Sequence, residues 1–207
     1  MAPEPDALRD EVRRGTLRGP ALVALLESLP EAARDVWVER LLGLDLAPPP
    51  PRAGDGELIG HHASGVGALL QLIREVPIRA SDVFVDLGSG LGKATLLTHL
   101  VSGATAVGQE LEPTLVEAAR QRAAALGLTG VTYVHGDARQ GVPEGGIYYL
   151  YLPFIGAALD AAMARLEEAT RGREAVVCTL GLDLARWPWL RARESTAFWT
   201  CVYDRIA

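Results

Sequence analysis

The stretch Val83-Phe84-Val85-Asp86-Leu87-Gly88-Ser89-Gly90-Leu91-Gly92-Lys93 decides the fold of this 207-residue chain. Its apolar beginning predicts a short buried strand, and three glycines separated by single residues follow at once. Glycine tolerates positive φ and lets a ligand approach the backbone closely. Because ligands of open α/β sheets bind beyond the carboxyl ends of the strands, this loop predicts a ligand site.

Strand and helix patterns alternate on both sides of that loop. Strands are expected at residues 83–86, 104–109, 131–135, 147–152 and 175–180, and helices at 64–76, 92–101, 113–127 and 156–169. This alternation predicts a Rossmann-like α/β fold, with a mostly parallel sheet and helices on both faces. Residues 196–204 follow only a short irregular stretch, so we expect an antiparallel strand at or near an edge. Ser64 is expected to cap the helix that precedes the first strand.

The chain before residue 57 has a different character. An apolar stripe at Leu22, Leu25, Leu26 and Leu29 indicates helices, and four prolines at 48–51 end that pattern. We therefore expect three parts, which are a helical segment at 1–46, a stiff linker at 47–56 and an α/β domain at 57–207.

Composition narrows the functional classes. The formal net charge of −6 argues against a nucleic-acid partner, because such surfaces are basic. The local cluster Arg9, Arg13, Arg14 and Arg18 is interpreted as a solvated helix face. No apolar run approaches the roughly 20 residues that span a bilayer, so we expect no membrane contact and a cytoplasmic location. The two cysteines are interpreted as reduced core thiols, and their spacing predicts no metal site.

Three ligands compete for the glycine loop. A dinucleotide fingerprint would place glycine where Lys93 stands. A P-loop would need glycine at Leu87 and serine or threonine at Ala94, so its magnesium ligand is missing. The pattern that begins at Asp86 and continues through Gly88, Ser89, Gly90 and Gly92 is the one that S-adenosylmethionine enzymes use. That cofactor carries an ammonium and a sulfonium, which favour a carboxylate at the strand end.

Two further acidic residues follow the next two strands. Glu110 ends the second strand, where a carboxylate can accept hydrogen bonds from both ribose hydroxyls of an adenosine ligand. Asp137, followed by Ala138, comes after the third strand, where it can accept the adenine amino group. Each of these acids alone would be interpreted as a solvated strand-end charge. Together with Asp86 they predict an adenosine-binding edge of the sheet.

These motifs resemble the Rossmann-like S-adenosylmethionine-dependent methyltransferase superfamily over about residues 57–206. Within it, the chain is most similar to the non-SET histone lysine methyltransferases of the disruptor-of-telomeric-silencing type. The resemblance implies S-adenosylmethionine as cofactor and methyl transfer as the reaction. The sequence differs from that family where Tyr151 replaces an asparagine, just before Phe154.

Methyl transfer is an in-line displacement, in which the enzyme mainly aligns the reacting atoms and excludes water. We expect Tyr151 to position the nucleophile and Phe154 to form a wall of the site. His62 is a candidate base or cofactor contact, from a pair with His61 just before the covering helix. Lys93 is interpreted as a surface charge, and His99 and His135 as structural residues.

The expected function is therefore methyl transfer to an acceptor that is either a protein or a small molecule. An amine such as protein lysine is slightly favoured by the family resemblance. A non-catalytic module that binds S-adenosylmethionine as a sensor or scaffold fits the same loop. A nucleotide-binding dehydrogenase is the third alternative, and Lys93 disfavours it.

Overall fold

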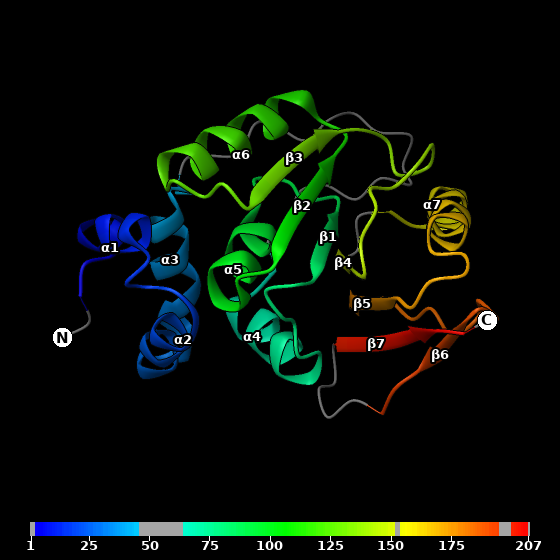
Figure 1. The fold of residues 1–207 in the computed structure, drawn as a ribbon, viewed down its shortest axis with the longest axis horizontal. Helices are drawn as coiled ribbons and strands as arrows, with labels where there is room; N and C mark the ends of the chain where they lie inside the picture. The colour runs from blue at the N-terminus through cyan, green and yellow to red at the C-terminus, as the bar shows by residue number, and fades with distance from the viewer. Residues whose placement is uncertain (1–2, 46–63, 152–153, 195–199, 207) are drawn as a thin grey trace.

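A computed structural model describes residues 3–45, 64–151, 154–194 and 200–206. The strands are β1 (Val83–Leu87), β2 (Thr105–Glu110), β3 (Val131–His135), β4 (Ile147–Tyr151), β5 (Val176–Leu180), β6 (Leu190–Ala192) and β7 (Thr200–Arg205). Within the described residues they form one sheet in the order β3-β2-β1-β4-β5-β7-β6 (Figure 1). Neighbours from β3 to β5 are parallel, whereas β7 runs antiparallel to both β5 and β6. The predicted Rossmann-like α/β fold is confirmed.

Successive side chains of each strand point to opposite faces of the sheet, and each face has its own hydrophobic core. On one face Phe84 and Tyr149 pack under three helices, which are α4 (Val66–Glu75), α5 (Lys93–Ser102) and α6 (Pro113–Ala125). On the other face Val85 and Tyr148 pack under α7 (Gly156–Ala169). Tyr149 and Tyr151 lie two residues apart on β4 and both pack against the first core.

Between residues 3 and 45, four helical elements precede this α/β unit. They are the 3-10 turn η1 (Pro5–Leu8), α1 (Arg9–Arg14), α2 (Gly19–Ser28) and α3 (Glu31–Leu42). Figure 1 draws them in blue beside α5, on the side away from the sheet. Leu22 and Leu26 are fully buried and join the same apolar cluster as Leu96 and Leu97 of α5. The N-terminal helices therefore extend the core of that face.

The arginine cluster at the N-terminus is in part the solvated face that the sequence predicts, since Arg13 and Arg14 are exposed, but Arg9 and Arg18 are half-buried. The Arg9 side chain donates to the carbonyl of Leu41 at 3.1 Å, at the end of α3. Arg13 donates to the carbonyl of Ala125 at 2.7 Å, at the end of α6. Helix C-termini leave carbonyls without intrahelical partners and carry partial negative charge, which explains why cations bind there. These arginines therefore fasten helices together.

One strand was not predicted, one predicted cap is wrong, and one predicted segment lies beyond the described residues. The short edge strand β6 was not predicted, because three residues carry too little periodicity. Ser64 does not cap α4, whose N-cap is Gly65 and whose Val66 amide instead donates to the Asp35 carboxylate at 3.0 Å. The predicted linker at 47–56 lies outside the described residues. Among the helices that are described, none is long and apolar enough to cross a membrane.

Candidate functional site

The glycine loop turns sharply between β1 and α5. Gly88, Gly90 and Gly92 all have positive φ, at 81°, 54° and 87°, a region that other residues enter only with strain. The amides of Gly88 and Ser89 donate to the Gln109 carbonyl at 2.8 and 3.0 Å. The loop is therefore fastened to the carboxyl end of β2, at the edge where parallel α/β sheets bind ligands.

Tyr133 of β3 explains why glycine is needed at two of the nearby positions. A Cβ placed on Gly92 would lie 2.0 Å from the Tyr133 hydroxyl oxygen, and one on Gly108 would lie 2.6 Å from its ring. The buried hydroxyl donates weakly to the Gly92 carbonyl at 3.4 Å. Burial raises the pKa of Tyr133, so it stays a neutral phenol that fills the space beneath the loop.

Asp86 lies beneath the loop with its carboxylate turned inward. Its side chain is 4% exposed, and its Oδ2 accepts from the Thr95 hydroxyl at 2.7 Å. Burial raises the pKa of Asp86 to about 7, and the nearby negative charge of Glu110 adds to the increase, while the Thr95 bond opposes it. Direct contact between Asp86 and a cofactor stays a prediction. In this structure its carboxylate joins β1 to the first turns of α5.

Glu110 joins the end of β2 to the glycine loop. Its Oε2 accepts from the Gly90 amide at 2.9 Å, and its Oε1 accepts from the Glu112 amide at 2.9 Å. A carboxylate offers about four lone-pair sites, two on each oxygen. One site on each oxygen of Glu110 is therefore left, which matches the two hydroxyls of a ribose.

Asp137 lies after β3 and forms an ion pair with Arg139. The Arg139 guanidinium donates to both carboxylate oxygens at 2.8–3.0 Å, and its backbone amide donates to Oδ1 at 2.9 Å. The side-chain bond from Arg139 holds the pKa of Asp137 below its usual range, so the carboxylate is charged. Arg139 donates twice to each oxygen, so an adenine amino group would replace one of these Arg139 bonds. Ala138 beside it is buried in the core under α7.

The residues at this edge fit an adenosine-type cofactor. The Ser89 hydroxyl is buried with no hydrogen-bond partner among the described residues, so it is available to a ligand. Glu110 keeps two acceptor sites, and Gly88 and Gly90 present only backbone on either side of Ser89. The described residues contain no group of three or more His, Cys, Asp or Glu side chains that could hold a metal ion.

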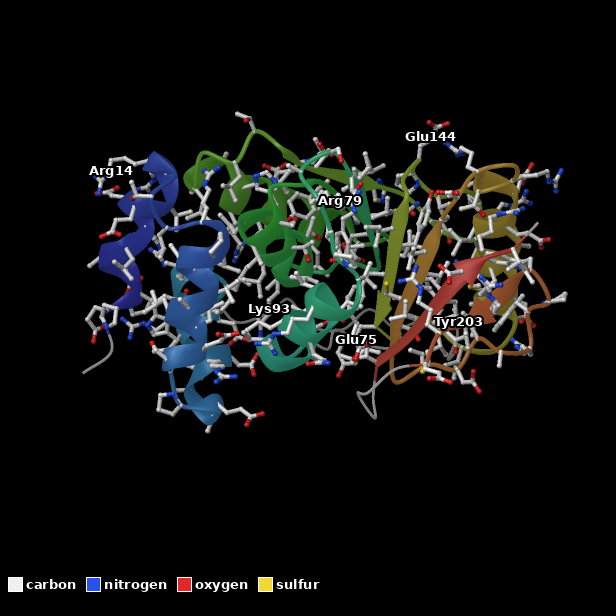
Figure 2. All side chains as sticks on the ribbon, turned by 60° about the horizontal axis from the view of Figure 1, so that its bottom comes forward. Arg14, Glu75, Arg79, Lys93, Glu144 and Tyr203 are labelled. Atoms are coloured by element: carbon white, nitrogen blue, oxygen red, sulfur yellow. The ribbon has the colours of Figure 1, made fainter. Side chains whose placement is uncertain are left out.

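Lys93 is not the surface charge that the sequence predicted. Its side chain is only 6% exposed, and its ammonium lies 2.6 Å from the Asp35 carboxylate and 2.8 Å from that of Glu39. Both acids come from α3. Figure 2 shows Lys93 between the N-terminal helices and α4, close to where α5 begins. The prediction failed because the two acids lie more than fifty positions away in the sequence.

The candidate acceptor side of the site is only partly described. Tyr151 ends β4 and is half-buried, whereas Phe154 is 6% exposed and packs into the core under α7. The two side chains therefore pack against cores on different faces of the sheet. His61 and His62 lie outside the described residues. The Tyr149 hydroxyl is 2.6 Å from the Ser64 hydroxyl, which fixes the chain just before α4.

His99 has the structural role that the sequence predicted, since its Nδ1 lies 2.7 Å from the Ala104 carbonyl oxygen. The roles of Thr95, Tyr133, Asp35 and Glu39 were not predicted from the sequence. Thr95 could have been found, because it lies in the first turn of a helix that must face the preceding strand. The other three carry no local signal.

Comparison with known proteins supports this description. Residues 64–130 match the family model described as "Histone methylation protein DOT1". That segment runs from the start of α4 to the turn before β3 and contains the glycine loop and Glu110. A search of curated proteins found no match.

Solved structures with the same fold include several methyltransferases. An RNA methyltransferase from Salinibacter ruber, solved with S-adenosyl-L-homocysteine, is 21% identical with a TM-score of 0.53, covering 70% of this chain and 92% of its own. The putative methyltransferase yhhF from Escherichia coli is 18% identical with a TM-score of 0.53, covering 67% and 82%. A dimethyladenosine transferase from Plasmodium falciparum is 14% identical with a TM-score of 0.53, covering 70% and 62%. The chain therefore has the Rossmann-like methyltransferase fold.

Proposed function

We propose that this protein binds S-adenosylmethionine at the carboxyl edge of β1, β2 and β3 and transfers its methyl group to an acceptor. The observation that carries the proposal is the position of Glu110, whose carboxylate accepts from the Gly90 amide and keeps one acceptor site on each oxygen. Ribose recognition and the glycine loop are thereby joined in one rigid unit. The match to the DOT1 model over residues 64–130 covers this same unit.

Different residues of the chain bind the ribose, the adenine and the methionyl parts of the cofactor. Glu110 accepts from the ribose hydroxyls, with charge-assisted bonds that contribute on the order of 1.5–3 kcal/mol each. Asp137 accepts from the adenine amino group, and Ala138 contributes an apolar contact. The methionyl end lies against the glycine loop around Ser89. When bound, S-adenosylmethionine supplies a methyl group on a positively charged sulfur, which is an activated leaving group.

The acceptor that the residues favour is an amine, and protein lysine is the first candidate. The formal net charge of −6 attracts a cationic acceptor. We assign the orientation of the nucleophile to Tyr151, which ends the strand next to β1, and keep Phe154 and His62 as further candidates. In-line transfer needs alignment and exclusion of water more than a strong base.

Thermal melting with S-adenosylhomocysteine tests the binding proposal. At about 100 times its dissociation constant a ligand adds about 2.7 kcal/mol, which corresponds to a shift of roughly 5–11 °C for a chain of this size. Glu110→Ala should abolish the shift, whereas Glu117→Ala on the exposed face of α6 should leave it intact. NAD should produce no shift. A shift with NAD alone, or an unchanged shift in Glu110→Ala, would contradict the proposal.

Transfer of a labelled methyl group tests the reaction and the acceptor together. We expect label from S-adenosylmethionine to appear on lysine in protein fractions of a cell extract. Label on RNA or on small molecules would support the proposed methyltransferase activity and contradict lysine as its acceptor. Tight cofactor binding without any labelled product would favour a non-catalytic module.

A further inference from the structure

Asp35 and Glu39 of α3 reach across to the start of α5. Their carboxylates accept from the Lys93 ammonium at 2.6 and 2.8 Å. The Asp35 oxygen that contacts Lys93 also accepts from the Val66 amide at 3.0 Å, at the first residue of α4. A single carboxylate oxygen of Asp35 therefore contacts the first residue of α4 and the first residue of α5. These two helices flank the candidate cofactor edge.

Lys93 is much more deeply buried than the two carboxylates that bind it, and this difference determines which partner depends on the contact. The Lys93 side chain is 6% exposed, whereas those of Asp35 and Glu39 are 47% and 34% exposed. Lys93 also lies at a helix N-terminus, where the partial positive charge of the helix disfavours a cation. Without the two carboxylates the ammonium would be a buried charge with no compensation, which is strongly destabilising. The carboxylates, by contrast, can be solvated without Lys93.

The backbone of Lys93 is coupled directly to the glycine loop. It follows Gly92 directly, and the Gly92 carbonyl accepts the first bond of α5, from the Leu96 amide at 2.8 Å. Beneath Gly92 the Tyr133 hydroxyl already fills the available space. A displacement of the Lys93 backbone toward water would therefore shift Gly92 and, with it, the loop that Glu110 holds at Gly90.

We propose that Asp35 and Glu39 are positioning residues for the glycine loop, acting through Lys93, so that the N-terminal helices determine the affinity for cofactor without touching it. This inference rests on the proposed function for its affinity measurement. It also makes a separate statement about the ligand-free protein, which is that neutralising α3 loosens residues 88–94.

The test compares two backgrounds of the full chain. In the first, Asp35→Asn with Glu39→Gln removes both charges and keeps an oxygen that the Val66 amide can bond. We expect S-adenosylhomocysteine to bind at least about tenfold more weakly and the amides of residues 88–94 to exchange at least about tenfold faster. In a Lys93→Met background, the same two substitutions should change either quantity by less than about threefold, because no buried ammonium needs compensation.

A matched control uses a different ion pair of the N-terminal helices, one that reaches α4. Glu27 of α2 pairs with Arg74, and both side chains are about half exposed, at 44% and 55%. Glu27→Gln should leave both the affinity and the loop exchange unchanged, because exposed pairs contribute little.

Several outcomes would overturn the inference. One is a doubly neutralised variant that melts at a lower temperature but binds S-adenosylhomocysteine as tightly as wild type, with unchanged exchange at 88–94. If that variant does not fold, the variant that also carries Lys93→Met must fold and bind, and its failure overturns the inference too. If wild-type protein does not bind S-adenosylhomocysteine, the proposed function fails, and the exchange at 88–94 alone decides about Asp35 and Glu39.

Discussion

At the scale of single residues, the candidate site depends on carboxylates in contrasting environments. Asp86 is buried beside Thr95 and has a raised pKa of about 7. Asp137 is paired with Arg139 and has a lowered pKa. Glu110 uses both of its oxygens to hold backbone amides. Depending on burial and partners, a carboxyl group is therefore a buried link that keeps its proton below about pH 7 (Asp86), a charged group (Asp137) or an acceptor that holds the loop (Glu110).

Asp86 gives a pH dependence whose sign follows from its raised pKa. Between pH 4 and 7 the folded protein keeps a proton on Asp86 that the unfolded chain releases, because the pKa rises from 3.8 to about 7. The stability that this group contributes is therefore complete in acid and is lost as the pH rises to 7. Relative to Asp86→Asn, wild-type protein should lose about 3 kcal/mol of unfolding free energy between pH 5 and 8.

Urea denaturation of ligand-free protein at each pH measures that difference. Asp137→Asn is the matched control, because a carboxylate with a lowered pKa is charged throughout this range and should give a constant difference. If the difference in unfolding free energy between wild type and Asp86→Asn were also constant with pH, the raised pKa of Asp86 would be contradicted.

At the scale of elements, the turn between β1 and α5 is held by what lies under it. The positive φ of Gly92 would be strained with any side chain, and Tyr133 of β3 removes the space for one. Gly127 after α6 also has positive φ, at 65°, but a Cβ added there would meet no atom within 4 Å. A side chain at Gly127 would meet only backbone strain, whereas one at Gly92 would meet both strain and overlap with Tyr133. Comparing substitutions at the two positions therefore separates the two effects.

Gly92→Ala should destabilise the protein by about 3 kcal/mol or more, because strain and overlap with the Tyr133 hydroxyl add. Gly127→Ala should cost only about 1–2 kcal/mol, from the backbone conformation alone. Chemical denaturation measures both values. Equal costs for the two substitutions would show that Tyr133 does not restrict the loop.

At the scale of the whole molecule, the N-terminal helices share the core of the α/β unit. Leu26 of α2 is fully buried in the apolar cluster that contains Leu96 and Leu97 of α5, and α2 packs directly against α5. We propose that residues 3–45 and the sheet unfold together. The sequence-based division into a helical segment, a linker and an α/β domain stays a prediction.

Leu26→Ala should lower the unfolding free energy by about 2–5 kcal/mol in one cooperative transition. Met163→Ala, from the opposite core under α7, should act on the same transition with a similar cost. Calorimetry and circular dichroism with coincident transitions would agree with this expectation. An early partial transition in Leu26→Ala, followed by melting at the wild-type temperature, would instead establish a separate N-terminal unit.

The sequence by itself determined the features that depend on local order along the chain. Strand–helix alternation, the glycine loop, and the acids after β1, β2 and β3 are visible because strand and helix periods are local, and because parallel strands bring their carboxyl ends to one edge. That order alone predicts Glu110 and the glycine loop at the same edge, and the Glu110 carboxylate does accept from the Gly90 amide at 2.9 Å.

Only the tertiary structure decided which distant groups meet beneath and beside that loop. Lys93 was interpreted as a surface charge because its partners, Asp35 and Glu39, are 58 and 54 positions away. Tyr133, 41 positions from Gly92, likewise has no local signal. Such contacts depend on how whole helices pack against one face of a sheet, and helix packing depends on side chains of several elements at once. The physical origin of the loop's rigidity is therefore long-range, although its sequence signature is local.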